Sequence, residues 1–210
     1  MFIFFLKSKE TTSLKKWEKD LLVKTFRLLG NDYTLYEEQI TTGIIESVRI
    51  NKLNSNFKRF RLNVKLLNKF ENKKGRSFFL HNIKVFDNIS NKYFTLSLDF
   101  GFGLILGYSM NESVNFNPEI EVINVDSIYK TYYGEDDFNK IKFLFSKEEL
   151  LLINPSEVYE LDLLGKIYYH LIDLEDGDFL AIDIDKNIYE ITHDPFEINL
   201  QKNELVNLLK

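Results

Sequence analysis

The sequence predicts an α+β fold with a mainly antiparallel sheet, an N-terminal helix and flanking C-terminal helices. Three observations support this class. Apolar residues recur at helical spacing near the N-terminus, apolar and polar residues alternate along later segments, and the regular strand–helix–strand order of a parallel sheet is absent. The 210 residues are 44% hydrophobic and 15% aromatic, which is enough for a large core. We therefore expect a single domain over 1–210, with the loop at 109–118 as the boundary if the chain is divided.

The first half of the chain opens with a short apolar run, residues 1–6, which we interpret as a first or edge strand. Residues 13–29 are predicted to form a helix, because leucines and Trp17 recur at helical spacing before a glycine. Three glycines, at 101, 103 and 107, lack the spacing of a phosphate-binding loop and indicate a bulge or bend in a strand. The remaining patterns predict a helix at 33–42 and strands at 44–50, 57–67, 76–86, 93–108 and 119–125.

The second half is predicted to contain helices at 137–152 and from Pro155 onward, then a strand at 167–174. A β-hairpin follows, and a helix at 199–209 closes the chain. The hairpin has the clearest pattern, because apolar and acidic residues alternate strictly along its first strand before a turn at 186–187.

The expected register of this hairpin places Ile182 opposite Ile191 and Asp183 opposite Glu190. One face of the hairpin is then apolar and the other acidic. Like charges that lie opposite each other disfavour strand pairing. The acidic face is therefore either solvated or in contact with a cation or a basic partner.

Charge is distributed unevenly along the chain. Residues 1–84 contain 18 Lys and Arg and 8 Asp and Glu, whereas residues 85–210 contain 9 and 24. This uneven charge has two interpretations. The two halves attract each other within the fold, or the acidic half presents a binding face to a partner.

Several classes of chemistry find no support in the sequence. There is no cysteine, the three histidines lack metal-binding spacing, and neither a GxSxG nor a P-loop motif occurs. We therefore predict a protein that is not an enzyme and has no catalytic residue, metal or cofactor. An enzyme with an unrecognised carboxylate site is a third hypothesis, because the chain is rich in Asp and Glu. No apolar stretch approaches the length of a membrane span, so we expect no membrane partner. The absence of cysteine, and therefore of disulfides, agrees with a cytoplasmic location.

A basic segment supplies an alternative function. Lys58, Arg59, Arg61 and Lys65 lie beside aromatic residues, a combination that binds the phosphates and bases of nucleic acids. Alternation in the predicted strand directs Phe60 inward and Arg59 and Arg61 outward. The net charge of −5 works against long-range attraction to nucleic acid, so this partner is the less favoured one.

The C-terminal hairpin also carries a family resemblance. The run Gly177-Asp-Phe-Leu-Ala-Ile-Asp183, then Ile188-Tyr189 and His193-Asp194 before a predicted helix, resembles the end of SUKH-superfamily proteins. Those proteins end with a strand of the type Gly-Asp-aromatic-aliphatic-Ala-x-Asp, a turn and a second strand. The N-terminal signature of the family, a helix followed by Leu-Pro, an aromatic residue and Asn-Gly, does not occur in residues 1–150.

The resemblance implies an α+β fold and a bacterial immunity protein that binds and neutralises a toxin. A bacterial source agrees with the composition, which has one alanine and abundant Lys, Asn, Ile and Phe. Our leading hypothesis is therefore a protein-binding module whose partner is a protein, such as a basic toxin. The residues expected to contact it are acidic: Asp176, Asp178, Asp183, Asp185 and Glu190.

Overall fold

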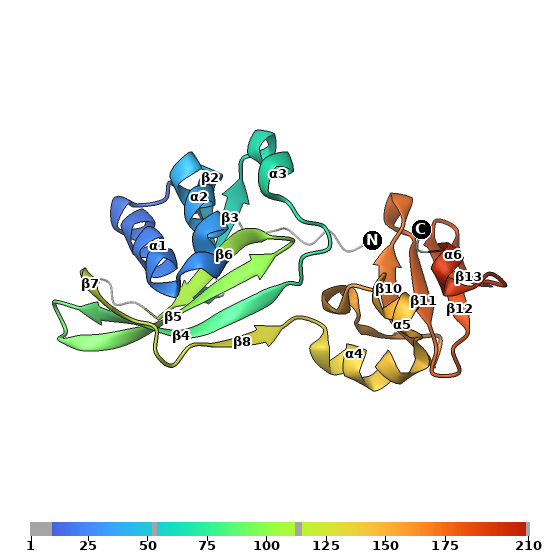
Figure 1. Cartoon of the computed structure of the whole chain (residues 1–210). Helices are drawn as coiled ribbons and strands as arrows, with labels where there is room; N and C mark the ends of the chain where they lie inside the picture. Colours follow the sequence, from blue (N-terminus) through green and yellow to red (C-terminus); the bar gives the residue numbers. More distant parts are fainter. Residues whose placement is uncertain (1–9, 52–53, 112–114, 209–210) are drawn as a thin grey trace. The chain divides into compact units, whose positions relative to one another are not determined.

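The computed structural model of the protein describes residues 10–51, 54–111 and 115–208 (Figure 1). These residues form six α-helices and 13 strands, and every strand pairing with a described register is antiparallel. The predicted α+β class with a mainly antiparallel sheet is confirmed. The strand expected at residues 1–6 lies outside the described residues.

The chain divides into two compact units, Met1–Thr131 and Tyr132–Lys210. Each unit has its own sheet. The loop at 109–118, which was the expected boundary of a divided chain, lies inside the first unit, and the division falls after Thr131 instead.

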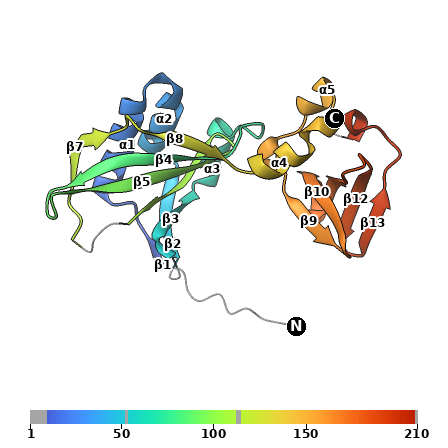
Figure 2. The same cartoon turned by 90° about the horizontal axis from the view of Figure 1, so that it is seen from below.

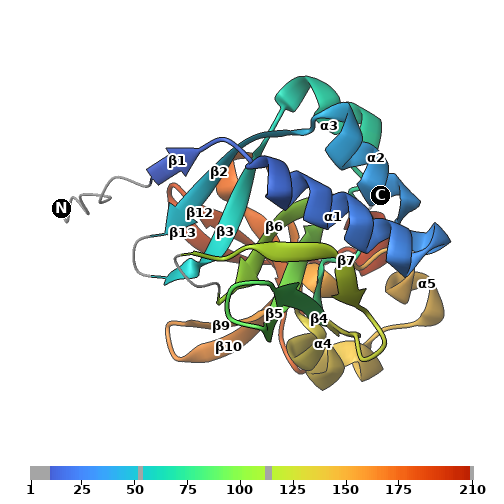
Figure 3. The ribbon, with the colours of Figure 1, turned by 90° about the vertical axis from the view of Figure 1, so that its left-hand side faces the viewer.

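The first unit is built on an eight-stranded sheet with the order β1-β2-β3-β6-β5-β4-β7, in which β8 also pairs with β4. Helices α1 and α2 lie against one face of this sheet (Figure 3). In chain order the elements are β1 (Glu10–Thr12), α1 (Lys16–Leu29), η1 (Asn31–Tyr33), α2 (Thr34–Thr42), β2 (Ile45–Asn51), β3 (Asn54–Leu62), α3 (Val64–Phe70), β4 (Phe78–Asp87), β5 (Lys92–Gly101), β6 (Leu104–Met110), β7 (Pro118–Asn124) and β8 (Tyr129–Tyr132).

The core of the first unit forms where α1 and α2 meet the sheet. Leu21, Leu22 and Phe26 of α1 are buried. The ring of Phe26 lies 6.2 Å from that of Phe100 on β5, and the ring of Tyr36 on α2 lies 4.5 Å from Phe100 in an edge-to-face arrangement. Aromatic side chains bury large apolar areas, so these contacts hold both helices on one face of the sheet.

The strand predicted at 57–67 is too long. β3 ends at Leu62, and the side chain of Asn63 then accepts a hydrogen bond from the backbone N–H of Lys65, at 3.0 Å, as the N-cap of α3. The alternation that directs Phe60 inward also assigns Val64 to the inner face, but 75% of the surface of Val64 is exposed. The N-cap at Asn63 therefore ends β3 and starts α3, although the alternating pattern of apolar and polar residues continues beyond Leu62.

The strand predicted at 93–108 is two strands, β5 and β6, joined by a tight turn. Phe102 and Gly103 both have positive φ, 52° and 74°, and form the turn between Gly101 and Leu104. The interpretation of these glycines as a bulge or bend within one strand is therefore wrong for Gly101 and Gly103. Glycine accommodates positive φ without strain, and here it allows the chain to reverse.

The second unit is built on a five-stranded sheet with the order β13-β12-β11-β10-β9. Figure 2 shows α4, α5 and α6 on the same side of this sheet. The elements are α4 (Glu135–Ile141), η2 (Lys142–Leu144), α5 (Lys147–Leu150), η3 (Pro155–Glu157), β9 (Glu160–Leu163), β10 (Lys166–Asp173), η4 (Glu175–Gly177), β11 (Phe179–Ile182), β12 (Ile188–His193), β13 (Phe196–Leu200) and α6 (Leu205–Leu208).

The helices predicted in this half are shorter or absent. The predicted helix at 137–152 is interrupted because Ser146 begins a new capping box with Glu149 and starts α5. The predicted helix after Pro155 is a single 3-10 turn, η3, followed by the strand β9. Most of the predicted closing helix is replaced by β13 and a loop, and only its last turn forms, as α6.

The C-terminal hairpin is present, but its register differs from the expected one. Ile182 pairs with Ile188, and Ile191 pairs with Phe179. Leu180 rather than Asp183 lies opposite Glu190. β11 ends at Ile182, and the next five residues form a loop instead of a two-residue turn. The predicted opposition of two carboxylates therefore does not occur.

Candidate functional site

The second sheet has two different faces. One face packs against the helices, because Tyr169, Leu171, Ile182 and Ile188 cluster with buried residues of α4 and α6. The other face carries a second apolar cluster, and every described member of it belongs to a strand: Leu161, Leu163, Tyr168, Phe179, Ala181, Tyr189, Ile191 and Ile198. We call this set the apolar sheet face. No helix contributes a described residue to it.

Aromatic side chains dominate the centre of the apolar sheet face. The rings of Tyr168 and Tyr189 meet edge to face with centroids 5.1 Å apart. The ammonium group of Lys166 lies 5.2 Å from the Tyr168 ring and 4.7 Å from the Tyr189 ring. At the β13 margin Leu200 remains 57% exposed, although it pairs with Tyr189 across the sheet. Tyr168, Ala181 and Ile191 are buried, whereas the other members of the apolar sheet face are partly exposed. A partly exposed aromatic and aliphatic surface of this kind is typical of a protein interface.

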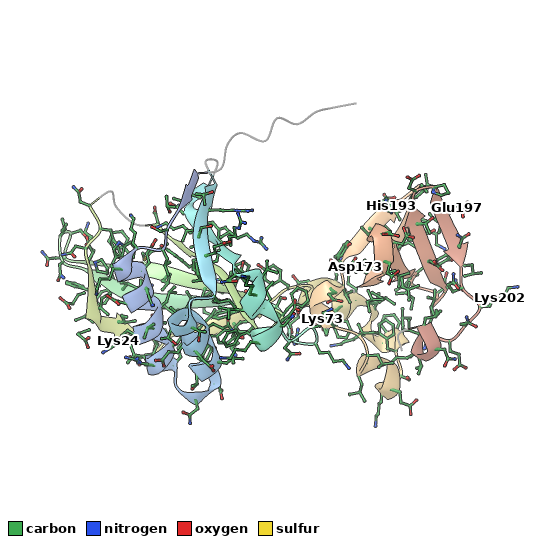
Figure 4. The ribbon with its side chains drawn as sticks, turned by 90° about the horizontal axis from the view of Figure 1, so that it is seen from above. Lys24, Lys73, Asp173, His193, Glu197 and Lys202 are labelled. Atoms are coloured by element: carbon green, nitrogen blue, oxygen red, sulfur yellow. The ribbon has the colours of Figure 1, made fainter. Side chains whose placement is uncertain are left out.

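One end of the same sheet is strongly acidic. Six carboxylates belong to the two turns at this end or to the strand termini beside them: Asp173, Glu175, Asp176, Asp178, Asp194 and Glu197. We call this set the acidic end. The two turns are connected, because Asp178 accepts hydrogen bonds from the backbone N–H of His193, at 3.1 Å, and from its Nδ1, at 3.0 Å. His193 and Glu197 lie near each other in Figure 4.

His170 is the only buried histidine in the described part of the chain, and it is structural. Its Nδ1 lies 2.8 Å from the carbonyl oxygen of Glu157, and its Nε2 lies 2.9 Å from a carboxylate oxygen of Asp173. The rings of Tyr159 and Phe179 flank the imidazole at 4.5 and 5.2 Å. Because both ring nitrogens are used within the fold, His170 has no nitrogen directed at a substrate.

The five acidic residues predicted to bind a partner do not form one surface. Asp176 and Asp178 belong to the acidic end. Asp185 is exposed, but it lies in the β11–β12 loop at the opposite end of the sheet. Glu190 is half-buried and accepts a hydrogen bond from Gln201 at 2.9 Å.

Asp183 corrects the prediction most clearly, because 1% of its surface is exposed. One of its carboxylate oxygens accepts the backbone N–H groups of Asp185 and Asn187 at 3.0 and 2.9 Å. The other accepts Lys166 Nζ at 2.7 Å and the Tyr189 hydroxyl at 3.0 Å. Burial alone raises the pKa of Asp183, but hydrogen bonds from Lys166, Asn187 and Tyr189 outweigh it and lower the pKa to about 2.

The predicted basic residues also separate. Lys58 faces the core with 6% of its surface exposed, 3.0 Å from Glu18 Oε1 and 2.8 Å from the Tyr108 hydroxyl. It ties β3 to α1 and is not available to a nucleic acid. Arg59 and Arg61 are exposed on β3 as predicted, and Lys65 is exposed on α3.

Arg49 is a basic residue that the sequence prediction missed. It lies on β2 directly opposite Arg59 on β3. The alternation of the strand at 44–50 assigns Arg49 to a face, but only the register of β2 with β3 reveals its neighbour. Asp173, Asp194 and Glu197 were missed for the same reason, since strand pairing brings their turns together.

The charge of the chain follows its division into units. The first unit contains 20 Lys and Arg and 14 Asp and Glu, a net charge of +6. The second contains 7 and 18, a net charge of −11. The chain therefore presents one basic unit and one strongly acidic unit.

The described residues contain no group of three or more His, Asp or Glu placed to hold a metal ion. None of their helices is long and apolar enough to cross a membrane. Comparison with models of known protein families, with curated proteins and with solved structures finds no match for this chain.

Proposed function

We propose that the protein is a non-enzymatic binding module whose second unit engages a basic protein. The observation that carries this proposal is the pairing of the apolar sheet face with the acidic end on one sheet. The partner would be a basic toxin, and the protein a bacterial immunity protein of the cytoplasm, as the SUKH-like hairpin suggests.

Apolar and charged parts of such a surface have different roles. Buried aromatic and aliphatic side chains supply most of the affinity at the centre of a protein interface. Charged groups at the rim steer the approach of an oppositely charged partner and add less to the final affinity. Tyr189, Ile198 and Leu200 keep exposed surface and fit the first role, and exposed carboxylates such as Asp176 fit the second.

The negative net charge of the second unit favours a positively charged protein as its partner. A charge of −11 on 79 residues repels acidic proteins and nucleic acids and attracts cationic surfaces. Asp173 has a side chain that is 82% exposed, so part of this charge is accessible to a partner even though Asp173 also contacts His170.

The proposal is tested by affinity capture from a lysate of the source organism with the tagged full-length chain, followed by mass spectrometry. The informative variant is Glu175→Gln with Asp176→Asn, which removes two exposed carboxylates from the acidic end. Asparagine tolerates the positive φ of 58° at position 176. We expect the wild type to recover a basic protein in stoichiometric amount and the variant to recover much less of it.

The matched control is Glu148→Gln with Asp185→Asn, which removes two exposed carboxylates outside the acidic end. It is expected to recover the same partner as the wild type. Equal loss with both variants would mean that only net charge matters. Equal recovery with both would remove the acidic end from the interface.

A further inference from the structure

We propose that the first unit binds single-stranded nucleic acid on the sheet face opposite α1. The residues that form this surface, here called the arginine face, are Arg49, Arg59, Arg61, Phe57 and Ser109. The arginine face belongs to a different unit from the acidic end, so either surface can function without the other.

Strand alternation separates the arginine face from the core. On β3, Lys58 and Phe60 are buried toward the helices, and Lys58 contacts Glu18 of α1. Phe57 and Arg59 are displaced by one residue from these two and therefore point to the opposite face of the sheet. Arg59 is exposed and Phe57 is half-buried. This face of the strand is accordingly open to solvent.

Strand register gathers the arginines. Arg49 on β2 lies directly opposite Arg59 on β3, and Arg61 is the next residue along β3 on the same face. Arg61 pairs with Glu46 at 2.8 Å, whereas neither Arg49 nor Arg59 forms an ion pair within the described residues. Like charges that lie directly opposite each other destabilise a strand pair. A phosphate bound between the two guanidinium groups removes that repulsion.

The neighbouring strand β6 places no side chain next to Arg59, and Asp99 on β5, which pairs with β6 at this position, is buried with 2% of its surface exposed. Gly107 of β6 lies opposite Arg59 and has no side chain to cover the sheet. A Cβ atom at position 107 would lie 2.4 Å from the carbonyl oxygen of Lys58, so the close approach of β3 and β6 requires glycine there. Phe57 lies opposite Ser109, two residues before Arg59 on β3. Phe57 adds an aromatic ring to the arginine face, and Ser109 adds a hydroxyl group.

This combination indicates a single strand as the occupant. Guanidinium groups bind phosphates in a bidentate manner, and an aromatic ring on an open sheet stacks with an unpaired base. A flat sheet face enters neither groove of a duplex easily. The net charge of −5 for the whole chain conceals a charge of +6 on the unit that carries the arginines, which favours a polyanion locally.

The test is fluorescence anisotropy with a labelled oligouridylate of about 20 nucleotides, titrated with the full-length protein at increasing salt. The variant is Arg49→Gln with Arg59→Gln. We expect wild-type binding at low salt, a loss of about tenfold in the variant, and a salt slope that falls by about 1.4 because two phosphate contacts are removed. Thermal unfolding should show no loss of stability, because the substitution relieves the repulsion between the two arginines.

The control is Lys16→Gln with Lys19→Gln, which removes two exposed cations from α1 on the other side of the sheet. It should bind within about twofold of the wild type, because both lysines are remote from the arginine face. Absence of wild-type binding at low salt, or equal weakening in both variants, would overturn the proposal. A salt-dependent dimer of the wild type that the Arg49→Gln/Arg59→Gln variant abolishes, without oligonucleotide binding, would overturn it in favour of a second copy as the occupant.

Discussion

Asp183 holds the β11–β12 loop through a single buried carboxylate. Two backbone N–H groups, the Lys166 ammonium and the Tyr189 hydroxyl all donate to it within 3.0 Å. The Asn187 side-chain amide donates a fifth hydrogen bond at 3.1 Å. Hydrogen bonds to an ionised group are stronger than neutral ones, and here five of them converge on one side chain. The carboxylate therefore stabilises the second unit and is not available to a partner.

Replacing this residue gives a test of stability. Asp183→Asn keeps the size of the side chain but removes its charge and turns one acceptor into a donor that faces Lys166 and Tyr189. We expect a loss of about 2–3 kcal/mol in the free energy of unfolding, measured by urea denaturation. Asp185→Asn, two residues away and exposed, should change it by less than about 0.5 kcal/mol.

The same residue predicts an acid dependence. The pKa of Asp183 is about 2 in the folded chain against a reference value of 3.8, so its contribution is complete above about pH 4. Protonation as the pH falls toward 2 removes that contribution. The stability difference between wild type and Asp183→Asn should therefore shrink over this range. A difference that stays constant from pH 6 to pH 2 would contradict the role assigned to the carboxylate.

Several residue-level predictions were correct because they depend on local alternation alone. Phe60 is buried, and Arg59 and Arg61 are exposed. Alternation also places Lys58 on the same face of β3 as Phe60, but its charge led to the opposite expectation, and the burial of Asp183 in the loop after β11 was not predictable from alternation. A charged residue is expected outside the fold by default, and only long-range partners such as Glu18 for Lys58 make its burial favourable.

At the scale of elements, the two faces of the second sheet differ, and the apolar sheet face is the one that belongs to the proposed interface. Its strands carry partly buried apolar residues without a covering helix in the described part of the chain. The opposite face is filled by α4 and α6. Replacing an exposed leucine with a charged residue should therefore weaken partner binding on the apolar sheet face and not on the face that carries the helices.

Leu200→Asp and Leu151→Asp test this asymmetry. Leu200 lies on β13 in register with Tyr189, and Leu151 follows α5 on the helical side; both are exposed, at 57% and 81%. We expect Leu200→Asp to weaken binding of the captured partner by about tenfold in a calorimetric titration, because a charge enters an apolar contact. Leu151→Asp should leave the affinity unchanged. Equal effects of the two substitutions would contradict the assignment of the interface.

The elements that the sequence predicted best are those with a strong period and a clear stop. α1 ends before Gly30, and α2 ends before Gly43, as expected. The errors occur where two structures share one apolar pattern. The capping side chains of Asn63 and Ser146 start the helices α3 and α5 at points where the apolar pattern alone does not predict a helix start. The register of the hairpin differs from the expected one because the five-residue loop held by Asp183 replaces a two-residue turn.

At the scale of the whole molecule, the chain consists of a basic unit and an acidic unit. The sequence shows the uneven charge but not where the chain divides, because contacts between distant strands define the units. The division after Thr131 assigns +6 and −11 to two separate sheets. We propose that the acidic unit binds a basic protein and that the basic unit binds a nucleic acid, so each unit would bind a partner of opposite charge.

The most direct test of the proposed protein-binding function is the association rate constant of the captured partner as a function of ionic strength. For the wild type we expect a rapid association that slows steeply as salt is added, because the acidic end steers a basic partner. The Glu175→Gln/Asp176→Asn variant should associate more slowly at low salt and show a shallower dependence, and the Glu148→Gln/Asp185→Asn control should follow the wild type. Superimposable rates for all three proteins across the salt series would contradict the claim that the acidic end faces the partner.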